Sequence, residues 1–357
     1  MSLSDITVVE RSQSPRGAMC GRLLSDFGAS VHLIEEPDGH PLRSLTGDAE
    51  TDEHIFKMYC VNKSGVHTDG QYSKFEDLIK TADVFIIDTP NPQDKYSEST
   101  LRDINPDITY CSITPYGRTG PLAEKDGDNM TTQAMSGISH TTGFEGGKPA
   151  LTAAHIGATF ASLVGLGSII YSLSDEDGED SIDISVQDAL LPLNRTFLGK
   201  YFGTGQQIDR SGNQHPLVAP WNAFEAEDGW VFLIAYTNRD WKRLLDLLGR
   251  QDLDGDPRFS SMAKRKANVD EINDIIEQWV SKRSVSDILE LADDHGVVAT
   301  EIKDVQQAFT HPNLDHRQMT TDLDGDLVVR PPLSLEQSID SEAYQTSALN
   351  HEAGGNE

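Results

Sequence analysis

Apolar residues in the first half of the chain form short runs that alternate with amphipathic stretches. A short apolar run between turn residues is typical of a buried strand, and an apolar stripe every three or four residues is typical of a helix. The runs that predict strands are residues 6–9, 31–35, 84–87, 109–114 and 182–186. The stretches that predict helices are residues 18–26, 72–81, 129–140 and 156–173. Strands separated by helices indicate βαβ units, so we predict an α/β domain built on a parallel sheet.

The pattern changes in the second half, where helices are more frequent than strands. Strands are predicted at residues 230–235 and 300–303, and helices at 240–248, 269–282 and 285–295. A chain of 357 residues is long enough to bury two cores. We therefore predict a large domain over residues 1–200 and a smaller α+β domain over residues 212–319.

The charge of the chain narrows the classes of partner. Its 58 acidic residues exceed its 29 basic ones, which gives a formal net charge of −29, and the excess is spread along the sequence. Phosphate backbones require basic surfaces, so binding of nucleic acid is excluded. A uniformly acidic surface is typical of proteins that work at high salt, where screening weakens self-repulsion. We expect a halophilic origin; the alternative is an ordinary acidic enzyme.

Other features of composition indicate a cytoplasmic protein. Cys20, Cys60 and Cys111 have neither disulfide nor metal-ligand spacing, and no cluster of metal ligands is apparent in the sequence. The N-terminal residues lack a basic start followed by a long apolar run, so no signal peptide is expected. Residues 156–173 are apolar but rich in small residues, which favours a buried helix over a membrane span.

Residues 103–143 hold the arrangement most relevant to chemistry. An apolar strand at 108–113 is followed by a turn containing Gly117 and Gly120, and then by a helix that opens near Asn129. In open α/β sheets, ligand crevices form where strands end and helices begin. We predict that the turn at 116–121 and the start of this helix line a ligand cleft.

The string CSITPYGRTGPLAEKDGDNMTTQAMSGISHTTG within this region resembles the signature of family III CoA-transferases, the family of formyl-CoA and carnitine-CoA transferases. Further blocks that match in order are residues 20–43, 56–66, 181–191, 212–233, 256–272 and 295–319. The resemblance implies a Rossmann-like large domain to which residues 320–357 return. It also implies a dimer whose subunits interlace like links of a chain, and coenzyme A or acyl-CoA as substrate, with no covalently bound cofactor.

The resemblance further implies covalent catalysis by an aspartate that precedes a helix rich in small residues. That carboxylate attacks the thioester and becomes acylated, which divides one difficult exchange into easier steps. An ungapped comparison from the turn Thr141–Phe144 puts Ala158 at the nucleophile position. No Asp or Glu occurs between Gly146 and Ser174, so a shifted alignment finds no carboxylate there.

Related racemases use an acid/base aspartate four residues before a Gln-Ala pair, and Asn129 occupies that position here. An amide cannot accept a proton at neutral pH. Asp128 is a candidate replacement, with a helix N-cap as the alternative interpretation. His155 is a second candidate acid/base, with a hydrogen-bonded core histidine as its alternative.

CoA phosphates are bound by cations or backbone N–H groups. The resemblance implies that Arg43 and Lys63 lie near the nucleotide, whereas Glu36 replaces a phosphate-binding arginine of some relatives. Lys95 and Lys125 are further candidate cations; for Arg43, Lys63 and Lys95 the alternative is a surface cation that balances acidic neighbours. The remaining candidate ligand-binding residues are Tyr116 and Gly117.

Three functions remain open at this stage. The first is transfer of CoA between an acyl-CoA and a small carboxylic acid, with this chain as the non-catalytic subunit of a heteromer whose second homologue supplies the aspartate. The second is an enzyme active by itself, as a homodimeric transferase or a racemase-like enzyme, which uses Asp128, His155 or a non-covalent route. The third is a non-enzymatic acyl-CoA-binding or scaffold protein. None of the three requires a membrane.

Overall fold

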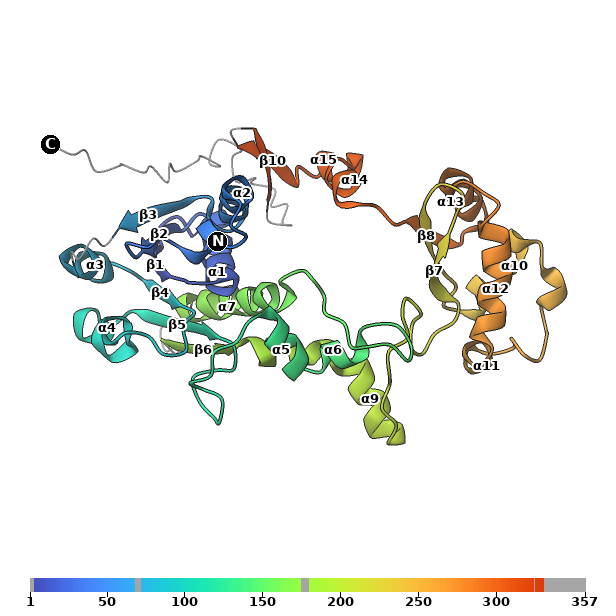
Figure 1. Ribbon diagram of the computed structural model, residues 1–357, viewed down its shortest axis with the longest axis horizontal. Helices are drawn as coiled ribbons and strands as arrows, with labels where there is room; N and C mark the ends of the chain where they lie inside the picture. The colour runs from blue at the N-terminus through green and yellow to red at the C-terminus, as the bar shows by residue number, and fades with distance from the viewer. Residues whose placement is uncertain (1–2, 68–71, 175–179, 324, 331–357) are drawn as a thin grey trace. The chain divides into compact units, whose positions relative to one another are not determined.

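The computed structural model describes residues 3–67, 72–174, 180–323 and 325–330, and it divides into two compact units (Figure 1). The larger unit contains Met1–Ser139, Leu151–Leu198 and the chain from Pro312 onward. The smaller unit contains His140–Ala150 and Gly199–His311. The segment His140–Ala150 thus belongs to the smaller unit, although it lies within the range predicted for the large domain.

A six-stranded sheet forms the centre of the larger unit. Its strands are β1 (Thr7–Arg11), β2 (Ser30–Glu35), β3 (Lys63–His67), β4 (Val84–Ile87), β5 (Thr109–Thr114) and β6 (Ser181–Ser185). All neighbouring pairs are parallel, and the order is β3-β2-β1-β4-β5-β6. The predicted Rossmann-like α/β architecture is confirmed. The order reverses between β1 and β4, which is where doubly wound sheets open a ligand crevice.

Helices cover both faces of this sheet (Figure 1). The helices α1 (Pro15–Asp26) and α7 (Ile156–Ser174) cover one face, and α3 (Tyr72–Ile79) and α4 (Glu98–Ile104) cover the other. Successive residues of a strand point to opposite faces. Val8 accordingly packs in the α1/α7 core, whereas Val9 packs in the α3/α4 core.

Helix α7 carries apolar residues on its packed face and also on its exposed face. Its small residues allow close packing, and a Cβ added at Gly165 would lie 3.0 Å from Cys20 Sγ of α1. By length and composition α7 resembles a membrane span, and among the described residues it is the one helix that does. In the structure its small-residue face packs against α1, β5 and β6.

The remaining elements of the larger unit surround this core. They are η1 (Pro41–Ser44), α2 (Ala49–Cys60), η2 (Asp94–Tyr96), α5 (Asn129–Met135), α8 (Val186–Leu190), η3 (Leu191–Asn194) and α15 (Pro312–His316). The helix predicted over residues 129–140 is instead two helices, α5 and α6 (Ile138–Thr141). Gly137 separates them because its φ of +85° cannot continue a right-handed helix.

The smaller unit has an antiparallel sheet and a helical layer. The strands β7 (Trp221–Glu225), β8 (Trp230–Ile234) and β9 (Val298–Glu301) pair in that order. The helices are α9 (Arg195–Thr204), which begins in the larger unit, α10 (Asn238–Leu248), η4 (Gln251–Leu253), α11 (Met262–Ala267), α12 (Val269–Val280), α13 (Val285–His295) and α14 (Val305–Phe309). The loop His140–Ala150 joins this unit through Arg210, whose guanidinium donates to Gly147 O and His140 O.

Beyond α15, the chain forms a hairpin on the larger unit. Strands β10 (Thr320–Leu323) and β11 (Asp326–Val329) pair antiparallel, and their apolar side packs on α2 through Val328 and Val61. Lys57 Nζ of α2 lies 2.7 Å from Asp326 Oδ2. Of the segment predicted to return to the large domain, residues 331–357 lie outside the described residues.

Candidate functional site

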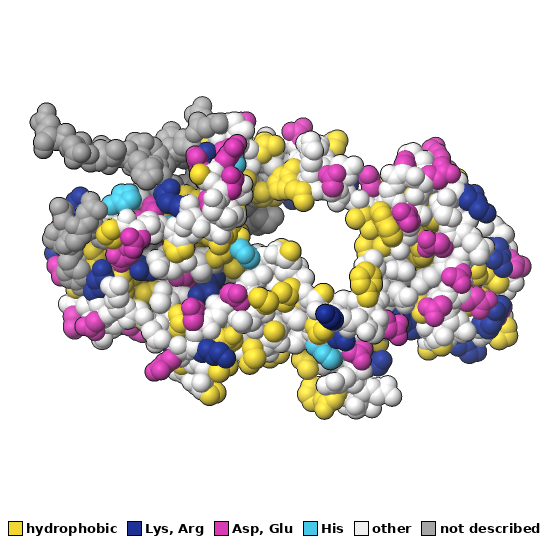
Figure 2. All heavy atoms as spheres, viewed as in Figure 1, with side chains coloured by type: hydrophobic (Ala, Val, Ile, Leu, Met, Phe, Trp, Pro, Cys, Tyr) yellow, Lys and Arg dark blue, Asp and Glu magenta, His cyan; other side chains and the backbone are white. Residues whose placement is uncertain are grey.

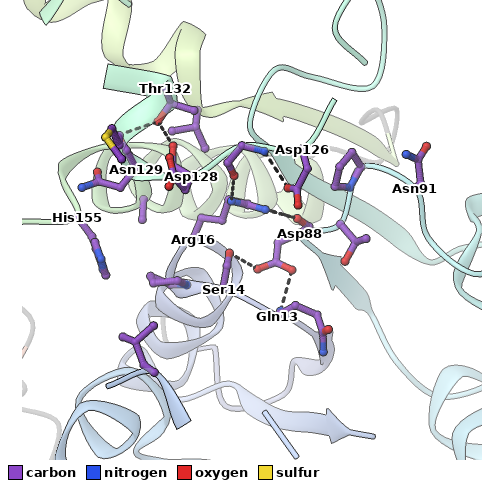
Figure 3. A pocket seen from close by; sticks show the side chains of 18 of the residues that line it. Gln13, Ser14, Arg16, Asp88, Asn91, Asp126, Asp128, Asn129, Thr132 and His155 are labelled. Carbon is purple, nitrogen blue, oxygen red and sulfur yellow. Dashed lines mark hydrogen bonds between the residues drawn. The ribbon is translucent and has the colours of Figure 1, made fainter. Parts of the chain in front are cut away.

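A pocket of about 730 Å³ opens at the carboxyl ends of β1 and β4 (Figure 3). It lies wholly within the larger unit, at the point where the strand order reverses. Its walls come from the segments that follow β1 and β4, from the start of α5 and from the start of α7. The lining residues include Gln13–Arg16, Leu45, Asp88–Asn91, Glu124, Asp126–Met130, Thr132, His155, Ala158 and Val186.

Asp88 organises the floor of the pocket. It follows β4 directly, is fully buried, and accepts hydrogen bonds from Gln13 N at 2.8 Å and Ser14 Oγ at 2.6 Å. A Cβ on Gly17 would lie 2.9 Å from Asp88 Oδ2, so α1 can approach this carboxylate only with glycine at that position. The carboxylate thereby fixes the β1–α1 loop against the end of β4.

Arg16 is the one guanidinium among the pocket-lining residues, and backbone carbonyls hold it (Figure 3). Nη2 donates to Asp88 O at 2.8 Å, Nη1 to Gly127 O at 3.1 Å, and Nε to Ile113 O at 3.2 Å. These bonds tie together three segments that end at the pocket. Arg16 therefore shapes the pocket, with several of its donors already engaged.

The start of α5 is fixed by a capping box. Asp128 Oδ1 accepts from Thr131 N at 2.8 Å, while Thr131 Oγ1 accepts from Asp128 N at 2.9 Å. These hydrogen bonds from Thr131 hold the pKa of Asp128 below its ordinary value. The N-cap interpretation of Asp128 is confirmed, and an ionised, hydrogen-bonded cap is poorly suited to donate a proton.

Asn129 joins two walls of the pocket through its amide. Its Nδ2 donates to Ala154 O at 3.3 Å, and its Oδ1 accepts from Gln133 Nε2 at 3.0 Å. Gln133 is buried and also bonds both polar groups of the Thr152 backbone. A carboxylate at residue 129 would lose the donation to Ala154 O, so the amide has a structural role here.

The first turn of α7 brings His155 and Ala158 to the pocket. Because α7 begins at Ile156, His155 is the residue that immediately precedes the helix, and Ala158 lies within its first turn. The His155 Nδ1 lies 3.0 Å from Tyr59 Oη of α2, and Tyr59 does not line the pocket. This contact engages Nδ1, one of the two ring nitrogens through which a histidine can exchange a proton.

Lys63 is not among the residues that line the pocket, and its place beside the nucleotide stays a prediction. Its Nζ is fully buried, 2.7 Å from Glu10 Oε2, and donates to Ala18 O at 2.7 Å. Burial raises the pKa of Glu10, and the ammonium of Lys63 opposes this rise. A buried charge requires a partner, so this lysine is committed to the core.

The other predicted ligand-binding residues also lie outside the pocket lining. Arg43 pairs with Glu35 at 2.8 Å and stacks over Phe56, and Lys95 lies 3.6 Å from Glu36. Tyr116 lies behind the wall, because a Cβ on Gly127 would be 2.9 Å from its Oη. Gly117 packs towards Asp183 of β6. Lys125 is exposed between Glu124 and Asp126, two residues that do line the pocket.

Of the two segments predicted to line the cleft, one lines the pocket and the other does not. The start of α5 borders the pocket as expected, whereas the turn at 116–121 does not. That turn is held against β6 instead, because Arg118 N donates to Asp183 at 3.0 Å and Gly117 N donates to Thr114 Oγ1 at 2.9 Å.

Comparison with known proteins places this chain in a family. The model of the family described as CoA-transferase family III matches residues 3–339. The chain belongs to this family. The family resemblance drawn from the sequence motifs is therefore confirmed, and CoA transfer is the activity common to the relatives named below.

Two relatives are named for different carboxylic acids, mesaconate and oxalate. The succinyl-CoA:mesaconate CoA-transferase of Haloarcula hispanica is 28% identical over 342 residues, covering 90% of this chain and 86% of the relative. The acetyl-CoA:oxalate CoA-transferase of Acetobacter aceti is 28% identical, covering 92% and 88%. Among solved structures, a CAIB/BAIF family protein from Brucella suis superposes with a TM-score of 0.82 at 28% identity, covering 94% of this chain and 93% of that one.

Sequence reasoning missed several residues that form the floor of this pocket. Gln13, Ser14 and Arg16 follow β1, and Asp88 follows β4. A signal was present, because polar residues directly after buried parallel strands gather at one edge of the sheet. Recognising the reversal between β1 and β4 would have required the strand order, which the hydrophobic pattern does not give.

Proposed function

We propose that this chain binds acyl-CoA in the pocket and takes part in transfer of CoA to a small carboxylic acid as the non-catalytic subunit of a heteromer. The observation that carries the proposal is the start of α7, where His155 and Ala158 reach the pocket and no residue from Gly146 to Ser174 is a carboxylate. A family member that lacks its own nucleophile needs a second homologue to supply one. The proposed complex is cytoplasmic and binds neither nucleic acid nor membranes.

An exposed apolar stripe on α7 supports the need for a partner chain. Phe160, Leu163, Val164 and Tyr171 recur at helical spacing, and the exposed fraction of their side chains ranges from 38% to 66%. Leu191, Leu193 and Leu198 nearby in the sequence are also exposed. Exposed apolar surface of this extent is typical of protein–protein interfaces. The interlaced arrangement implied by the family would cover it, with a homologue or with a second copy as partner.

The proposal is tested by trapping the acyl-enzyme intermediate. The purified chain is incubated with succinyl-CoA and an acceptor acid in the presence of hydroxylamine, and its peptides are mapped for hydroxamates. We expect no modified carboxylate on this chain. After co-purification from the native host at high salt, we expect a bound homologue that carries the modification. A hydroxamate on Asp88, Asp126 or Asp128 of the isolated chain would overturn the proposal.

Two variants locate the position of the missing nucleophile. The family nucleophile precedes the helix, so we expect His155→Asp to accumulate a trapped acyl group and Ala158→Asp to accumulate much less. Ala158→Asp is a matched control because it adds the same carboxylate to the same pocket one turn later. Trapping by Ala158→Asp alone would restore the assignment made by ungapped comparison of the sequences.

A further inference from the structure

The pocket walls complement the pantetheine arm of CoA. Pantetheine is uncharged and carries two amide groups, a hydroxyl group and a geminal dimethyl group. Side-chain amides and hydroxyls line the pocket from Gln13, Ser14, Thr89, Asn91, Asn129 and Thr132. Apolar surfaces come from Pro15, Leu45, Pro90, Met130, Ala158 and Val186. A volume of about 730 Å³ lies in the range that holds a small-molecule ligand.

The charges of the pocket do not complement the nucleotide of CoA, which carries a diphosphate and a 3′-phosphate. Asp88, Glu124, Asp126 and Asp128 place four carboxylates in its lining. The lining contains one guanidinium, that of Arg16, which already donates hydrogen bonds to the backbone carbonyls of Asp88, Ile113 and Gly127. Carboxylates and phosphates repel each other, and a bound phosphate would find few free donors.

Nearby cations are committed to carboxylates. Arg11 and Lys95 share Glu36, at 3.4 and 3.6 Å, and Tyr96 Oη donates to the same carboxylate at 2.8 Å. Together with the hydrogen bond from Tyr96, the charges of Lys95 and Arg11 keep the pKa of Glu36 low, although partial burial opposes this. Arg43 is likewise paired with Glu35. Glu36 therefore engages both Arg11 and Lys95, and its single negative charge offsets one of their two positive charges.

From this division of chemistry we infer that the pocket recognises the acyl-pantetheine part of its ligand and gains little affinity from the nucleotide. The substrate class is then pantetheine thioesters in general, with acyl-CoA as one member. The inference rests on the proposed function and adds to it which part of the thioester supplies binding. The phosphates of CoA remain outside the pocket, where solvent and counterions balance their charge.

The test compares three probes that share pantetheine: CoA, dephospho-CoA and pantetheine itself. Dissociation constants are measured by calorimetry on the full chain at 0.1 M and at about 1 M KCl, where the screening lengths are about 10 and 3 Å. We expect the three constants to agree within about threefold at high salt. Added salt should strengthen CoA binding or leave it unchanged, because screening relieves repulsion from the acidic lining.

Variants separate repulsion from recognition. Glu124→Gln combined with Asp126→Asn should strengthen CoA binding more than pantetheine binding, so that the ratio of the two affinities rises severalfold. Asp107→Asn is the matched control, since this exposed residue precedes the amino end of β5, whereas the pocket opens at the carboxyl ends of the strands. Lys125→Gln should leave the ratio of CoA to pantetheine affinity unchanged, because no phosphate is assigned to that lysine.

The binding measurements distinguish failure of this inference from failure of the proposed function. Binding of CoA more than tenfold tighter than pantetheine, weakened by salt or by Lys125→Gln, would overturn the inference and leave acyl-CoA binding intact. If none of the three probes binds, the inference and the proposed function both fail. Equal affinity for all three probes supports the inference.

Discussion

At the scale of single residues, Lys63 is a buried cation that links β1, α1 and β3 through an ion pair and a hydrogen bond. Its ammonium lies between Glu10 and Ala18 O beneath the first turns of α1, and neither charged side chain is exposed. Ser12 Oγ donates to Glu10 Oε1 at 2.5 Å and lies 3.2 Å from His40 Nε2. A Cβ on Gly21 would lie 1.7 Å from Glu10 Oε2, so this network also requires a glycine on α1. The charges are neutralised within the fold.

We predict that Lys63→Ala lowers the free energy of unfolding by about 3–5 kcal/mol, because it leaves the buried carboxylate of Glu10 without its charge partner. Denaturant titration measures this loss. The double variant Glu10→Gln with Lys63→Met should recover much of the stability, since it removes both charges together. Weakened CoA binding with unchanged stability in Lys63→Ala would instead restore the phosphate-binding role.

His40 gives the fold a dependence on pH. Its Nδ1 accepts from Leu42 N at 3.1 Å, and burial, followed by the charge of Lys63, lowers its pKa to about 3. The unfolded chain binds a proton near pH 6.5 and the folded chain does not, so stability is lost as pH falls from about 6.5 towards 3. We expect a contribution of about 1.4 kcal/mol per pH unit in that window.

The measurement compares the native chain with His40→Gln, which keeps a donor for Ser12 but does not titrate. The difference in unfolding free energy between pH 6.5 and 5 should be smaller in the variant. His316→Asn, at an exposed histidine, should behave as the native chain does. Identical pH profiles for His40→Gln and the native chain would contradict the prediction.

At the scale of elements, the hydrophobic pattern predicted the helices and strands that bury a regular run or stripe of apolar residues. Strands β4 and β5 and helix α13 have the predicted bounds, because each carries a regular apolar run or stripe. Helix α2 was missed, since its sequence AETDEHIFKMYC is mostly polar and only Phe56 and Cys60 bury apolar side chains. Strand β3 was not predicted, because the buried charge of Lys63 interrupts its apolar pattern. Partners distant in the sequence determine both elements.

The contact between α1 and β4 gives a prediction about the pocket. A Cβ at Gly17 would lie 2.8 Å from Ser12 Cβ and 2.9 Å from Asp88 Oδ2, so Gly17→Ala must displace the start of α1. We expect a loss of about 1–3 kcal/mol in stability and weaker binding of pantetheine and CoA alike. Unfolding titration and calorimetry on the same preparation measure both.

Gly167→Ala is the matched control, because this glycine also lies in a helix and nothing surrounds its Cβ position within 4 Å. In the isolated chain it should gain up to about 1 kcal/mol from helix propensity and bind ligand normally. Equal behaviour of the two alanine variants would show that close approach at Gly17 does not maintain the pocket.

At the scale of the whole molecule, acidic side chains are spread over the visible surface (Figure 2). Several are paired: Asp252, Asp254 and Asp256 each lie within 3.3 Å of a basic group. Other acidic residues lie where the helix dipole is unfavourable for them. Asp293 and Asp294 are in the last turn of α13, and the negative end of the helix dipole there repels their carboxylates. Exposed ion pairs of this kind add little to stability. They therefore do not offset the mutual repulsion that follows from a net charge of −29.

We therefore predict that the melting temperature rises as KCl is increased from 0.01 M to 1 M, because the screening length falls from about 30 Å to about 3 Å. Differential scanning calorimetry measures the rise. Asp293→Asn combined with Asp294→Asn should melt higher than the native chain at 0.01 M KCl and respond less to added salt, because two charges are removed from the end of α13. Asp252→Asn is the control, since Arg250 already pairs with that carboxylate at 2.8 Å. A melting temperature independent of salt would show that the acidic surface does not destabilise this fold.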